Sequence, residues 1–378
     1  MKFVAGTTQS AGNLARRDSG GLTTFDPDVR VAVVGYGYWG SKHIRVLSSM
    51  PGVQVTIVDN DPARIAEARR IYPAAESAAG LDDVLGRVDA VVVATPPSTH
   101  ATVALQALRQ GRHVLVEKPL ATTVEDAQEM VNAAAAGGVH LMAGHTFEYN
   151  AAVWKLKEII DSGELGRILY IDAARLSLGK YQRDCNVIWD LAPHDISIAS
   201  FLLDEVPRTA SVWANRHVGN RHADVAYLRL DFGRAATHAF VHVSWLDPCR
   251  VRRVTVVGER KMAVYNDMSD NERIRVYDIG VDPADPDEHG ESPAMPVSYR
   301  TGDIVSPFIQ FNEPLLVQDS HFIECIRTGA TPNTPGERGL DIVRVLAATD
   351  VAEATGRSAF VTGSIDPSGA DRMRGVAS

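Results

Sequence analysis

The stretch Val31-Ala-Val-Val-Gly-Tyr-Gly-Tyr-Trp-Gly40 decides how the first part of this 378-residue chain folds. Its leading apolar residues predict a buried strand, glycines follow in the pattern GxGxxG, and apolar residues continue at helical spacing to Leu47. A strand, a tight turn and a helix in this order form the fingerprint of a dinucleotide-binding unit. Gly35 permits the turn, Gly37 lets backbone approach a pyrophosphate, and Gly40 allows close helix packing.

The chain keeps alternating between strand and helix up to about residue 148. Strands are predicted at residues 53–58, 89–94, 114–116 and 139–142, and helices at residues 63–70, 98–110 and 123–136. Strands separated by helices predict a parallel, doubly wound sheet. We therefore expect an α/β domain over residues 27–148, preceded by a flexible arm at residues 1–26.

The pattern changes beyond residue 148. After one helix near residues 154–160, strands are predicted at residues 168–173, 208–213, 226–232, 239–245, 253–257 and 273–277. Strands that mostly follow one another directly predict an α+β domain over residues 149–378 with an open, largely antiparallel sheet. Residues 279–299, rich in Pro, Asp, Glu and Gly, predict a long surface loop. Helices are expected at residues 315–328 and 337–356, and a flexible tail at residues 365–378.

Bulk composition narrows the class of protein. The formal net charge of -9 and the lack of a dense Lys/Arg cluster argue against a nucleic-acid-binding role. Three widely spaced cysteines fit neither a disulfide framework nor a four-ligand zinc site, so we expect no metal and a reducing, cytoplasmic location. No apolar run reaches the roughly 18 to 20 residues that a membrane-spanning helix needs, so no membrane role is expected.

Asp59 follows the second predicted strand, 19 positions after Gly40. A carboxylate at this point of the fingerprint accepts hydrogen bonds from the adenosine ribose and repels a 2'-phosphate, so the sequence predicts NAD rather than NADP as the cofactor. Arg64 lies close enough in the sequence to weaken that preference. The alternative interpretation is that the glycines only form a turn and that Asp59 caps the helix beginning near Pro62.

Two more strand ends carry candidate site residues. Thr95-Pro-Pro97 would lie along the cofactor crevice, or it forms a turn before a helix that Ser98 or Thr99 caps. Lys118, in the motif Glu117-Lys-Pro119, follows the next apolar strand and should project from the carboxyl edge of the sheet, where ligands bind. The alternative for Lys118 is a surface lysine before a proline turn.

The segment Trp189-Asp-Leu-Ala-Pro-His-Asp195 leads into an apolar helix at residues 196–203. Because Pro193 suits a first helical turn, Asp190 and His194 should lie near each other where the helix begins. A carboxylate beside a histidine orients the imidazole and holds its pKa near neutrality, which suits a general base. The structural alternative is that Asp190 caps the helix and His194 packs in its first turn.

Together these motifs resemble those of the glucose-fructose oxidoreductase, inositol dehydrogenase and rhizopine-catabolism family, usually called Gfo/Idh/MocA. The resemblance runs from about residue 29 to the end and rests on Gly35–Gly40, Ala94–Pro97, Glu117–Pro119, Gly163–Gly166, Asp190–Asp195, Glu313–Leu315 and His321–Phe322. It implies an N-terminal Rossmann domain and a C-terminal domain whose open sheet often mediates homodimers or tetramers. It also implies that Lys118 polarises the reacting oxygen, that His194 is the acid/base, and that Asp190 orients His194 or binds a neighbouring hydroxyl.

Further candidate residues flank these motifs. The cofactor is expected to contact Gly35, Tyr36, Gly37, Tyr38, Trp39, Gly40, Asp59, Thr95, Pro96, Pro97, His100, Glu117 and Lys118. The substrate is expected to contact Tyr149, Asn150, Lys180, Tyr181, Asp184, Asn186, Asp190 and His194. Because some members of the family use tyrosine as the proton carrier, Tyr181 is a second acid/base candidate, with packing or substrate contact as the alternative.

One functional hypothesis accounts for all these motifs: an NAD(P)-dependent oxidoreductase that transfers a hydride between the nicotinamide and a secondary alcohol or ketone carbon. Its substrate would be a nucleotide-linked, aminoglycoside-type or free sugar, with an inositol or another cyclitol as the alternative. A non-catalytic dinucleotide-binding regulator would need the glycines but not Lys118, Asp190 and His194. A metal-dependent dehydrogenase would need a compact Cys/His ligand set, which the scattered histidines do not form in sequence.

Overall fold

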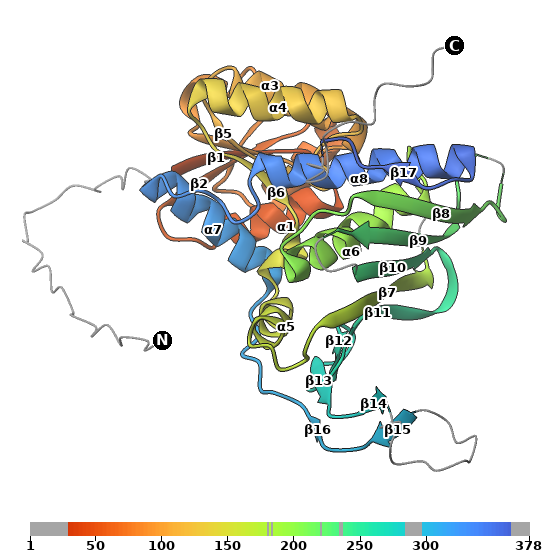
Figure 1. Cartoon of the computed structure of the whole chain (residues 1–378). Helices are drawn as coiled ribbons and strands as arrows, with labels where there is room; N and C mark the ends of the chain where they lie inside the picture. Colours follow the sequence, from red (N-terminus) through yellow and green to blue (C-terminus); the bar gives the residue numbers. More distant parts are fainter. Residues whose placement is uncertain are drawn as a thin grey trace, which may run out of the picture.

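The computed structural model describes residues 29–179, 181–182, 184–219, 221–233, 237–283 and 297–363. This part of the chain forms two large sheets, with helices around the first and along one side of the second (Figure 1). The predicted arm at residues 1–26, the predicted tail at residues 365–378 and the candidate residue Lys180 lie outside the described residues.

The first sheet is parallel, with the strand order β3-β2-β1-β4-β5-β6. Its strands are β1 (Val29–Val34), β2 (Val53–Val58), β3 (Glu76–Ala78), β4 (Ala90–Val93), β5 (His113–Glu117) and β6 (Leu141–Gly144). The helices are α1 (Tyr38–Leu47), α2 (Pro62–Ile71), α3 (His100–Leu108) and α4 (Val124–Gly137), with 3-10 turns η1 (Leu85–Arg87), η2 (Pro97–Thr99) and η3 (Thr146–Tyr149). The doubly wound parallel sheet is thereby confirmed, and its strand order reverses between β1 and β4, where such sheets bind ligands.

Successive residues of β1 face opposite sides of this sheet. Ala32 and Val34 belong to the core that contains α3 and α4, whereas Val31 and Val33 belong to the core that contains α1. Burying a valine side chain contributes about 1.5–3 kcal/mol to stability, so apolar residues stabilise the strand on both of its faces. This is why the strand is apolar at every one of these positions rather than at alternate ones.

The second sheet has the order β16-β13-β12-β11-β7-β10-β9-β8-β17. Its strands are β7 (Ile168–Leu178), β8 (Thr209–Asn215), β9 (Val225–Phe232), β10 (Thr237–Ser244), β11 (Leu246–Gly258), β12 (Met262–Asn266), β13 (Ile274–Tyr277), β16 (Ile304–Val305) and β17 (Ala359–Phe360). Only the β7–β10 pair is parallel within this sheet, which confirms the prediction of a largely antiparallel sheet. Helices α5 (Ala151–Asp161) and α6 (Val187–Leu203) lie along one face.

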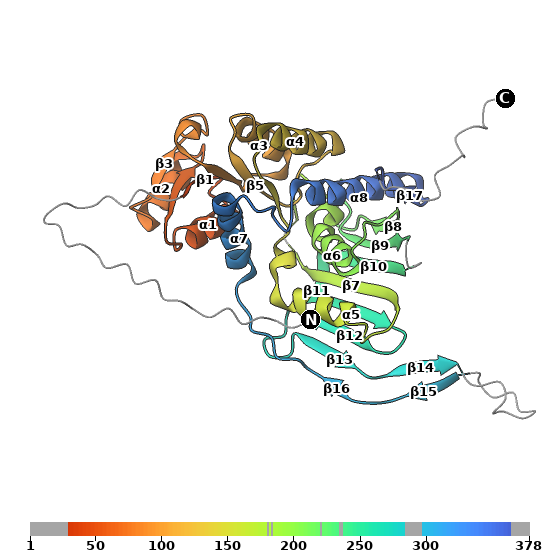
Figure 2. The same cartoon turned by 60° about the vertical axis from the view of Figure 1, so that its left-hand side comes forward.

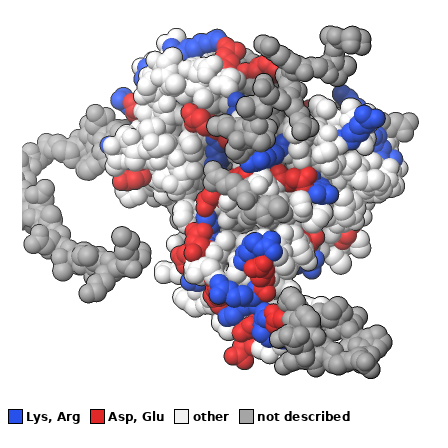
Figure 3. Space-filling model, in the orientation of Figure 1, with Lys and Arg blue, Asp and Glu red and all other residues white. Residues whose placement is uncertain are grey.

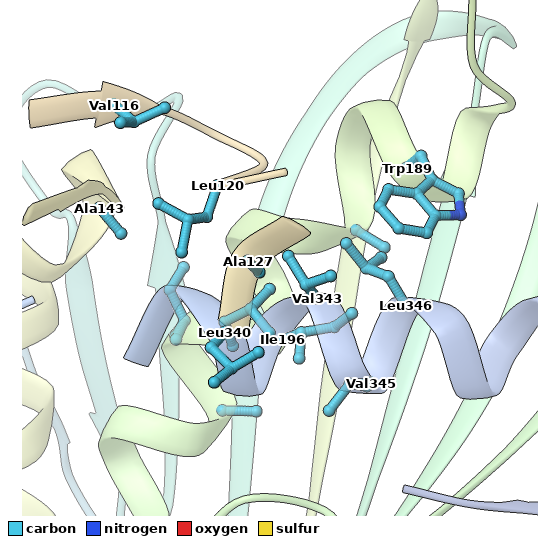
Figure 4. Close-up of a cluster of buried hydrophobic side chains, with 14 of the residues drawn as sticks. Val116, Leu120, Ala127, Ala143, Trp189, Ile196, Leu340, Val343, Val345 and Leu346 are labelled. Carbon is cyan, nitrogen blue, oxygen red and sulfur yellow. The ribbon is translucent and has the colours of Figure 1, made fainter. Parts of the chain in front are cut away.

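The last two helices, α7 (Pro314–Thr328) and α8 (Gly336–Thr355), return to the first sheet (Figure 2). Helix α7 packs on α1, while α8 contacts α4 and β6 on one side and α6 and β8 on the other. Figure 4 shows Leu340 and Val343 of α8 in one buried cluster with Leu120, which follows β5, and Ile196 of α6. An added Cβ at Gly339 would lie 2.9 Å from Leu120, so α8 approaches the loop after β5 very closely. One helix therefore joins the two sheets beside the predicted site.

The prediction of a surface loop over residues 279–299 is wrong at both ends. Gly280–Pro283 (β14) and Val297–Arg300 (β15) pair as antiparallel strands, and residues 284–296 lie outside the described part. Arg300 donates to both carboxylate oxygens of Asp282 at 2.7 and 2.6 Å. The charged composition that suggested a loop thus forms ion pairs between strands. Strands β3, β12, β16 and β17 were not predicted; β3, β16 and β17 have three residues or fewer, too few to show a period.

Helix α6 also begins earlier than predicted. It starts at Val187, so Pro193 lies in its interior instead of its first turn. The side chain of Asn186 caps the helix by accepting a hydrogen bond from the backbone N–H of Trp189 at 3.0 Å. The cap and the burial of Val187 and Trp189 outweigh the hydrogen bond that proline removes.

Charges of both signs are interspersed on the surface shown in Figure 3. Lys and Arg side chains lie next to Asp and Glu side chains, most densely in the lower part that β13–β16 form. Within the described residues, no helix combines the length and the apolar character needed to cross a bilayer.

Candidate active site

The turn between β1 and α1 has the shape that the fingerprint requires. Gly35 has a φ of +97°, and an added Cβ at Gly40 would lie 1.7 Å from the carbonyl oxygen of Gly35. An added Cβ at Gly37 would meet nothing within 4 Å, so this side of the turn is open. Gly37 is the N-cap of α1 and brings no capping side chain, which leaves the first N–H groups of the helix for an anion. These features fit a bound pyrophosphate.

Asp59 lies at the end of β2 and is held by the backbone. Its carboxylate accepts hydrogen bonds from the N–H of Tyr36 at 2.6 Å and from the N–H of Asp61 at 2.8 Å. The guanidinium of Arg64 is 3.5 Å from the same carboxylate. Asp61, rather than Asp59, caps α2, because it accepts from the N–H of Ala63 at 2.8 Å. The capping alternative for Asp59 is therefore wrong.

Lys118 lies directly after β5 and points toward α6. Its ammonium donates a hydrogen bond to the carbonyl oxygen of Asp190 at 2.7 Å and is 3.6 Å from the Asp190 carboxylate. The side chain is only 12% exposed, so the alternative of a solvated surface lysine is wrong. The peptide bond between Lys118 and Pro119 is cis.

The neighbouring Glu117 belongs to a buried ion cluster. His43 of α1 lies with Nε2 at 3.0 Å from Glu117 and with Nδ1 at 2.9 Å from Asp319 of α7. Burial lowers the pKa of His43, but the two carboxylates outweigh burial and raise it to about 10. The cluster is therefore an imidazolium between two carboxylates, and it fixes the backbone beside Lys118 to two helices.

Asp190 and His194 share α6 but are not hydrogen-bonded to each other in the structure. The Asp190 carboxylate accepts a hydrogen bond from the indole N–H of Trp245 at 3.0 Å, and Lys118 lies on its other side. The expected orientation of His194 by Asp190 is thus replaced by these two contacts. The alternative in which Asp190 caps the helix is also wrong, because Asn186 does so.

His194 is partly buried, and its Nδ1 has no hydrogen-bond partner among the described residues. Its ring lies edge-on to Phe147, with 5.0 Å between the ring centroids. Burial and the charges of Lys118, Arg175 and Arg252 hold the pKa of His194 well below its usual value. The imidazole is consequently neutral at neutral pH and can accept a proton.

His145 is a buried histidine beside the site, electrostatically coupled to Lys118 and His194, that the sequence analysis missed. It directly follows β6, is 1% exposed, and neither ring nitrogen has a hydrogen-bond partner among the described residues. Burial, Arg338 and Lys118 lower its pKa to about 3. The rule that identified Lys118, a polar residue at the carboxyl end of a parallel strand, would also have identified His145.

Two cavities open between the first sheet and α6. The larger, of about 370 Å³, is lined by Tyr38, Trp39, Lys42, Glu117, Thr146, Phe147, Asn150, His194, Arg250, Arg252, Asp267, Phe311, Glu313, Pro314 and Leu315. The smaller, of about 270 Å³, is lined by Pro97, Ser98, Lys118, Pro119, Thr122, Asp184, Cys185, Asn186, Trp189, Asp190, His222 and Asp350. His194 and Lys118 thus open onto different cavities, while the charge of Lys118 still acts on His194.

Other predicted cofactor residues surround the turn after β4. The Thr99 hydroxyl donates to the Thr95 hydroxyl and to the Pro96 carbonyl oxygen, each at 2.8 Å, and makes no capping bond to α3. His100 is 1% exposed, with its ring nitrogens 2.9 Å from the Thr95 carbonyl and 2.8 Å from the Pro119 carbonyl. His100 therefore holds two site loops together, with both ring nitrogens bonded within the protein.

Several predicted substrate residues have contacts within the protein. Tyr149 is buried and bonded to Thr334 at 3.0 Å, which keeps its hydroxyl from the cavities. Asn150 lines the larger cavity but also caps α5 and donates to the Tyr265 hydroxyl at 3.0 Å.

Tyr181 is exposed, and its hydroxyl donates to Asp224 at 3.4 Å. Its ring lies against the Trp245 ring, with the centroids 5.0 Å apart. Tyr181 lines neither cavity, so its geometry favours the packing alternative. Within the described residues, no group of three or more His, Cys, Asp or Glu side chains is placed to hold a metal ion.

Comparison with known proteins gives matches over both sheets. A model described as oxidoreductase family, NAD-binding Rossmann fold, matches residues 29–145, and a model of the Gfo/Idh/MocA C-terminal domain matches residues 153–264. The crystal structure of GenD2 from gentamicin A biosynthesis in complex with NAD has a TM-score of 0.74 at 23% identity, covering 92% of this chain and 99% of that chain.

Curated relatives include dehydrogenases of two kinds. Inositol 2-dehydrogenase of Rhodococcus erythropolis is 35% identical over 185 residues, which are 47% of this chain and 54% of that protein. The chain therefore spans about half the length of that relative. The 4-carboxy-2-hydroxymuconate-6-semialdehyde dehydrogenase of Sphingobium sp. is 26% identical over 339 residues, covering 85% of this chain and 98% of that protein. The chain belongs to the Gfo/Idh/MocA family of oxidoreductases, with a Rossmann domain that binds NAD.

Proposed function

We propose that the protein is an NAD-dependent oxidoreductase acting on a secondary alcohol or ketone carbon of a sugar or cyclitol. The carrying observation is a partly buried lysine, Lys118, at the carboxyl end of β5, whose charge acts on a neutral imidazole, His194. The first domain, over residues 27–148, holds the cofactor in this proposal. The second, over residues 149–378, supplies most of the substrate contacts.

Each of the three polar residues has a distinct role in alcohol oxidation. Lys118 donates a hydrogen bond to the reacting oxygen and stabilises the negative charge that develops there. His194 accepts the hydroxyl proton through the ring nitrogen opposite the buried Nδ1. Asp190, fixed by Trp245, holds the lysine ammonium and accepts from a neighbouring substrate hydroxyl. Bound NAD supplies the acceptor for the hydride that leaves the same carbon.

The relatives support a polyhydroxylated substrate. One of the matched proteins is named for inositol, whose ring consists of secondary alcohols like those of a sugar. Asp59 supports NAD over NADP, since its carboxylate lies at the end of β2 where the adenosine ribose is bound in this fold.

Absorbance of reduced nicotinamide tests the proposal directly. The purified protein is mixed with NAD or NADP and with a panel of free sugars, sugar acids, nucleotide sugars, aminoglycosides and inositols, and the reverse reaction is run with the corresponding ketones. Turnover with one class identifies the reaction and the substrate together. Tight binding of NAD without turnover in either direction would favour the dinucleotide-binding regulator instead.

We also propose that the protein is a cytoplasmic homo-oligomer. The three cysteines are free thiols, which a reducing compartment maintains. The second sheet exposes Tyr170, Trp213, Tyr227 and Phe240, a large aromatic surface for a monomer. Light scattering of the wild type and of a Phe240→Lys variant tests the assembly, with a monomeric wild type as the result that contradicts it.

A further inference from the structure

Strand β11 is irregular where it borders the larger cavity. Its pairing with β7 shifts between Leu246, opposite Leu178, and Val251, opposite Leu176, so extra residues of β11 bulge out of the ladder. Bulges commonly redirect side chains next to active sites. Arg250 lies in this bulge and Arg252 directly follows it, and both line the cavity that His194 lines.

The charges of this cavity do not cancel. Arg252 donates to Asp267 at 3.2 Å, but Asp267 is also 3.5 Å from Arg273. The side chain of Arg250 makes no ion pair or hydrogen bond with the described residues.

The other two carboxylates that line the cavity are neutralised from outside it. Glu117 is paired with the His43 imidazolium, and Glu313 accepts from Arg45. The cavity therefore has an excess of positive charge, from Lys42, Arg250 and Arg252, with free donors on the exposed side chain of Arg250. A bound anion would meet both this charge and these donors.

This excess charge acts on the proposed base. Arg252 is close enough to help lower the pKa of His194, and its own pKa is lowered by burial and by Arg175 and Arg250. Arg175 itself is satisfied, because it donates to both carboxylate oxygens of Asp195 at 2.8 and 3.0 Å. Arg252, which shares Asp267 with Arg273, thus brings positive charge toward His194, and Arg250 adds to the charge around Arg252.

We propose that Arg250 and Arg252 form an anion subsite, so that the carbohydrate substrate carries a phosphate or carboxylate group. The inference rests on the proposed function and narrows its substrate class. Guanidinium groups match both anions, because they offer paired N–H donors in a fixed fork. An anion held there places the rest of the substrate in the same cavity as His194, and polycationic aminoglycosides are disfavoured by the like charge.

Anion binding can be measured without catalysis. Isothermal titration of the NAD-loaded protein with inorganic pyrophosphate and with malonate, at low salt, compares wild type with Arg250→Gln and Arg252→Gln. Of pyrophosphate and malonate, one will bind wild type more tightly. We expect each variant to bind that anion about tenfold more weakly or worse. Arg253→Gln is the matched control, since Arg253 is exposed on the same strand and lines neither cavity. Equal binding by all four proteins would overturn the subsite.

Turnover then separates the two kinds of anion. Each neutral sugar of the panel is compared with its uronate, its phosphate and its nucleotide-diphosphate derivative. We expect a lower KM for one anionic series, and an increase of that KM by about tenfold or more in Arg252→Gln with a smaller change in kcat. Arg252→Lys, which keeps the charge, should recover part of the loss.

The two proposals fail in different ways. Equal kcat/KM for neutral and anionic sugars, unchanged in the arginine variants, would overturn the subsite and leave the oxidoreductase proposal standing. Arginine-dependent binding of pyrophosphate or malonate without turnover of any compound would support the subsite and contradict the oxidoreductase proposal.

Discussion

Two equally buried histidines of this protein have opposite charge states at neutral pH. His43 is 0% exposed and His145 is 1% exposed, so burial disfavours the charged form of both. Two carboxylates raise the pKa of His43 to about 10, whereas Arg338 and Lys118 help lower the pKa of His145 to about 3. Burial is the largest cause of the low pKa of His145, but because His43 is equally buried, the sign of the neighbouring charges accounts for the difference between the two. Carboxylate neighbours keep His43 charged in an ion cluster, whereas cationic neighbours help keep His145 neutral.

The largest effects on turnover are expected for the two polar side chains proposed to contact the reacting group, His194 and Lys118. His194→Ala and Lys118→Ala should each lower turnover by about a hundredfold to ten-thousandfold, because they remove a proton acceptor and an electrostatic group. Steady-state kinetics with the substrate found in the panel measures the loss. NAD affinity should stay the same in both variants. His140→Ala, at the opposite end of β6 from His145, is the control, and turnover near the wild-type value in His194→Ala would exclude the assigned role.

Removing the imidazolium of His43 from the ion cluster with Glu117 and Asp319 should lower the stability of the fold. His43→Gln leaves Glu117 and Asp319 buried without an opposite charge, which costs about 3–5 kcal/mol of unfolding free energy. The folded-state pKa of His43 is raised from 6.5 to about 10, so its contribution is complete below about pH 6.5 and is lost as the pH rises toward 10. Denaturant unfolding at several pH values measures both effects.

The double variant His43→Gln with Asp319→Asn provides the matching control, because it removes one of the two stranded charges. It should recover part of the stability. An unfolding free energy for His43→Gln that equals the wild-type value across this pH range would show that the cluster is not charged as described.

The preference for NAD over NADP should depend on Asp59, whose carboxylate lies next to the guanidinium of Arg64. Asp59→Ala should release Arg64, which lies 3.5 Å from it, to bind a 2'-phosphate. The ratio of kcat/KM for NADP to that for NAD should then rise by about tenfold, the size of one charged hydrogen bond. Adding Arg64→Ala to this variant should reverse the gain. An unchanged cofactor ratio in Asp59→Ala would count against the ribose contact.

The smallest effect is expected in the pH dependence that His194 gives to the reaction. Its lowered pKa predicts that kcat/KM stays level near neutral pH and falls only in more acidic solution, where the imidazole is protonated. Arg252→Gln removes one positive charge, which favours the protonated form and moves this acidic limb upward by a fraction of a pH unit. Lys118, Arg175 and His145 act in the same direction as Arg252 and remain in place. A limb that does not move would show that Arg252 is screened from His194.

The parallel sheet and its strand-end residues were predictable because they follow from local order. The glycine turn, Asp59 and Lys118 each lie where the alternation of strand and helix places them. The contact of Asp190 with Trp245 was not predictable, since the two residues come from different elements and meet only through tertiary packing. Local sequence rules contain no information about such pairs.

Arg250 and Arg252 were missed for a related reason. The predicted strand began at residue 253, because the bulge of β11 interrupts the period that identifies strands. The residues 279–299 were misjudged from composition alone, since ion pairs such as Arg300–Asp282 stabilise strands only when the partner is known.

The return of α7 to the first sheet has a consequence for synthesis of the protein. Phe322 and Ile323 of α7 complete the core that Val31 and Val33 begin, and these residues leave the ribosome long after the strand does. The nascent first sheet therefore carries an uncovered apolar face while the second sheet is still being made. That face is open to chaperones and to other chains until α7 emerges, so the last helices act as the closing step of folding as well as part of its core.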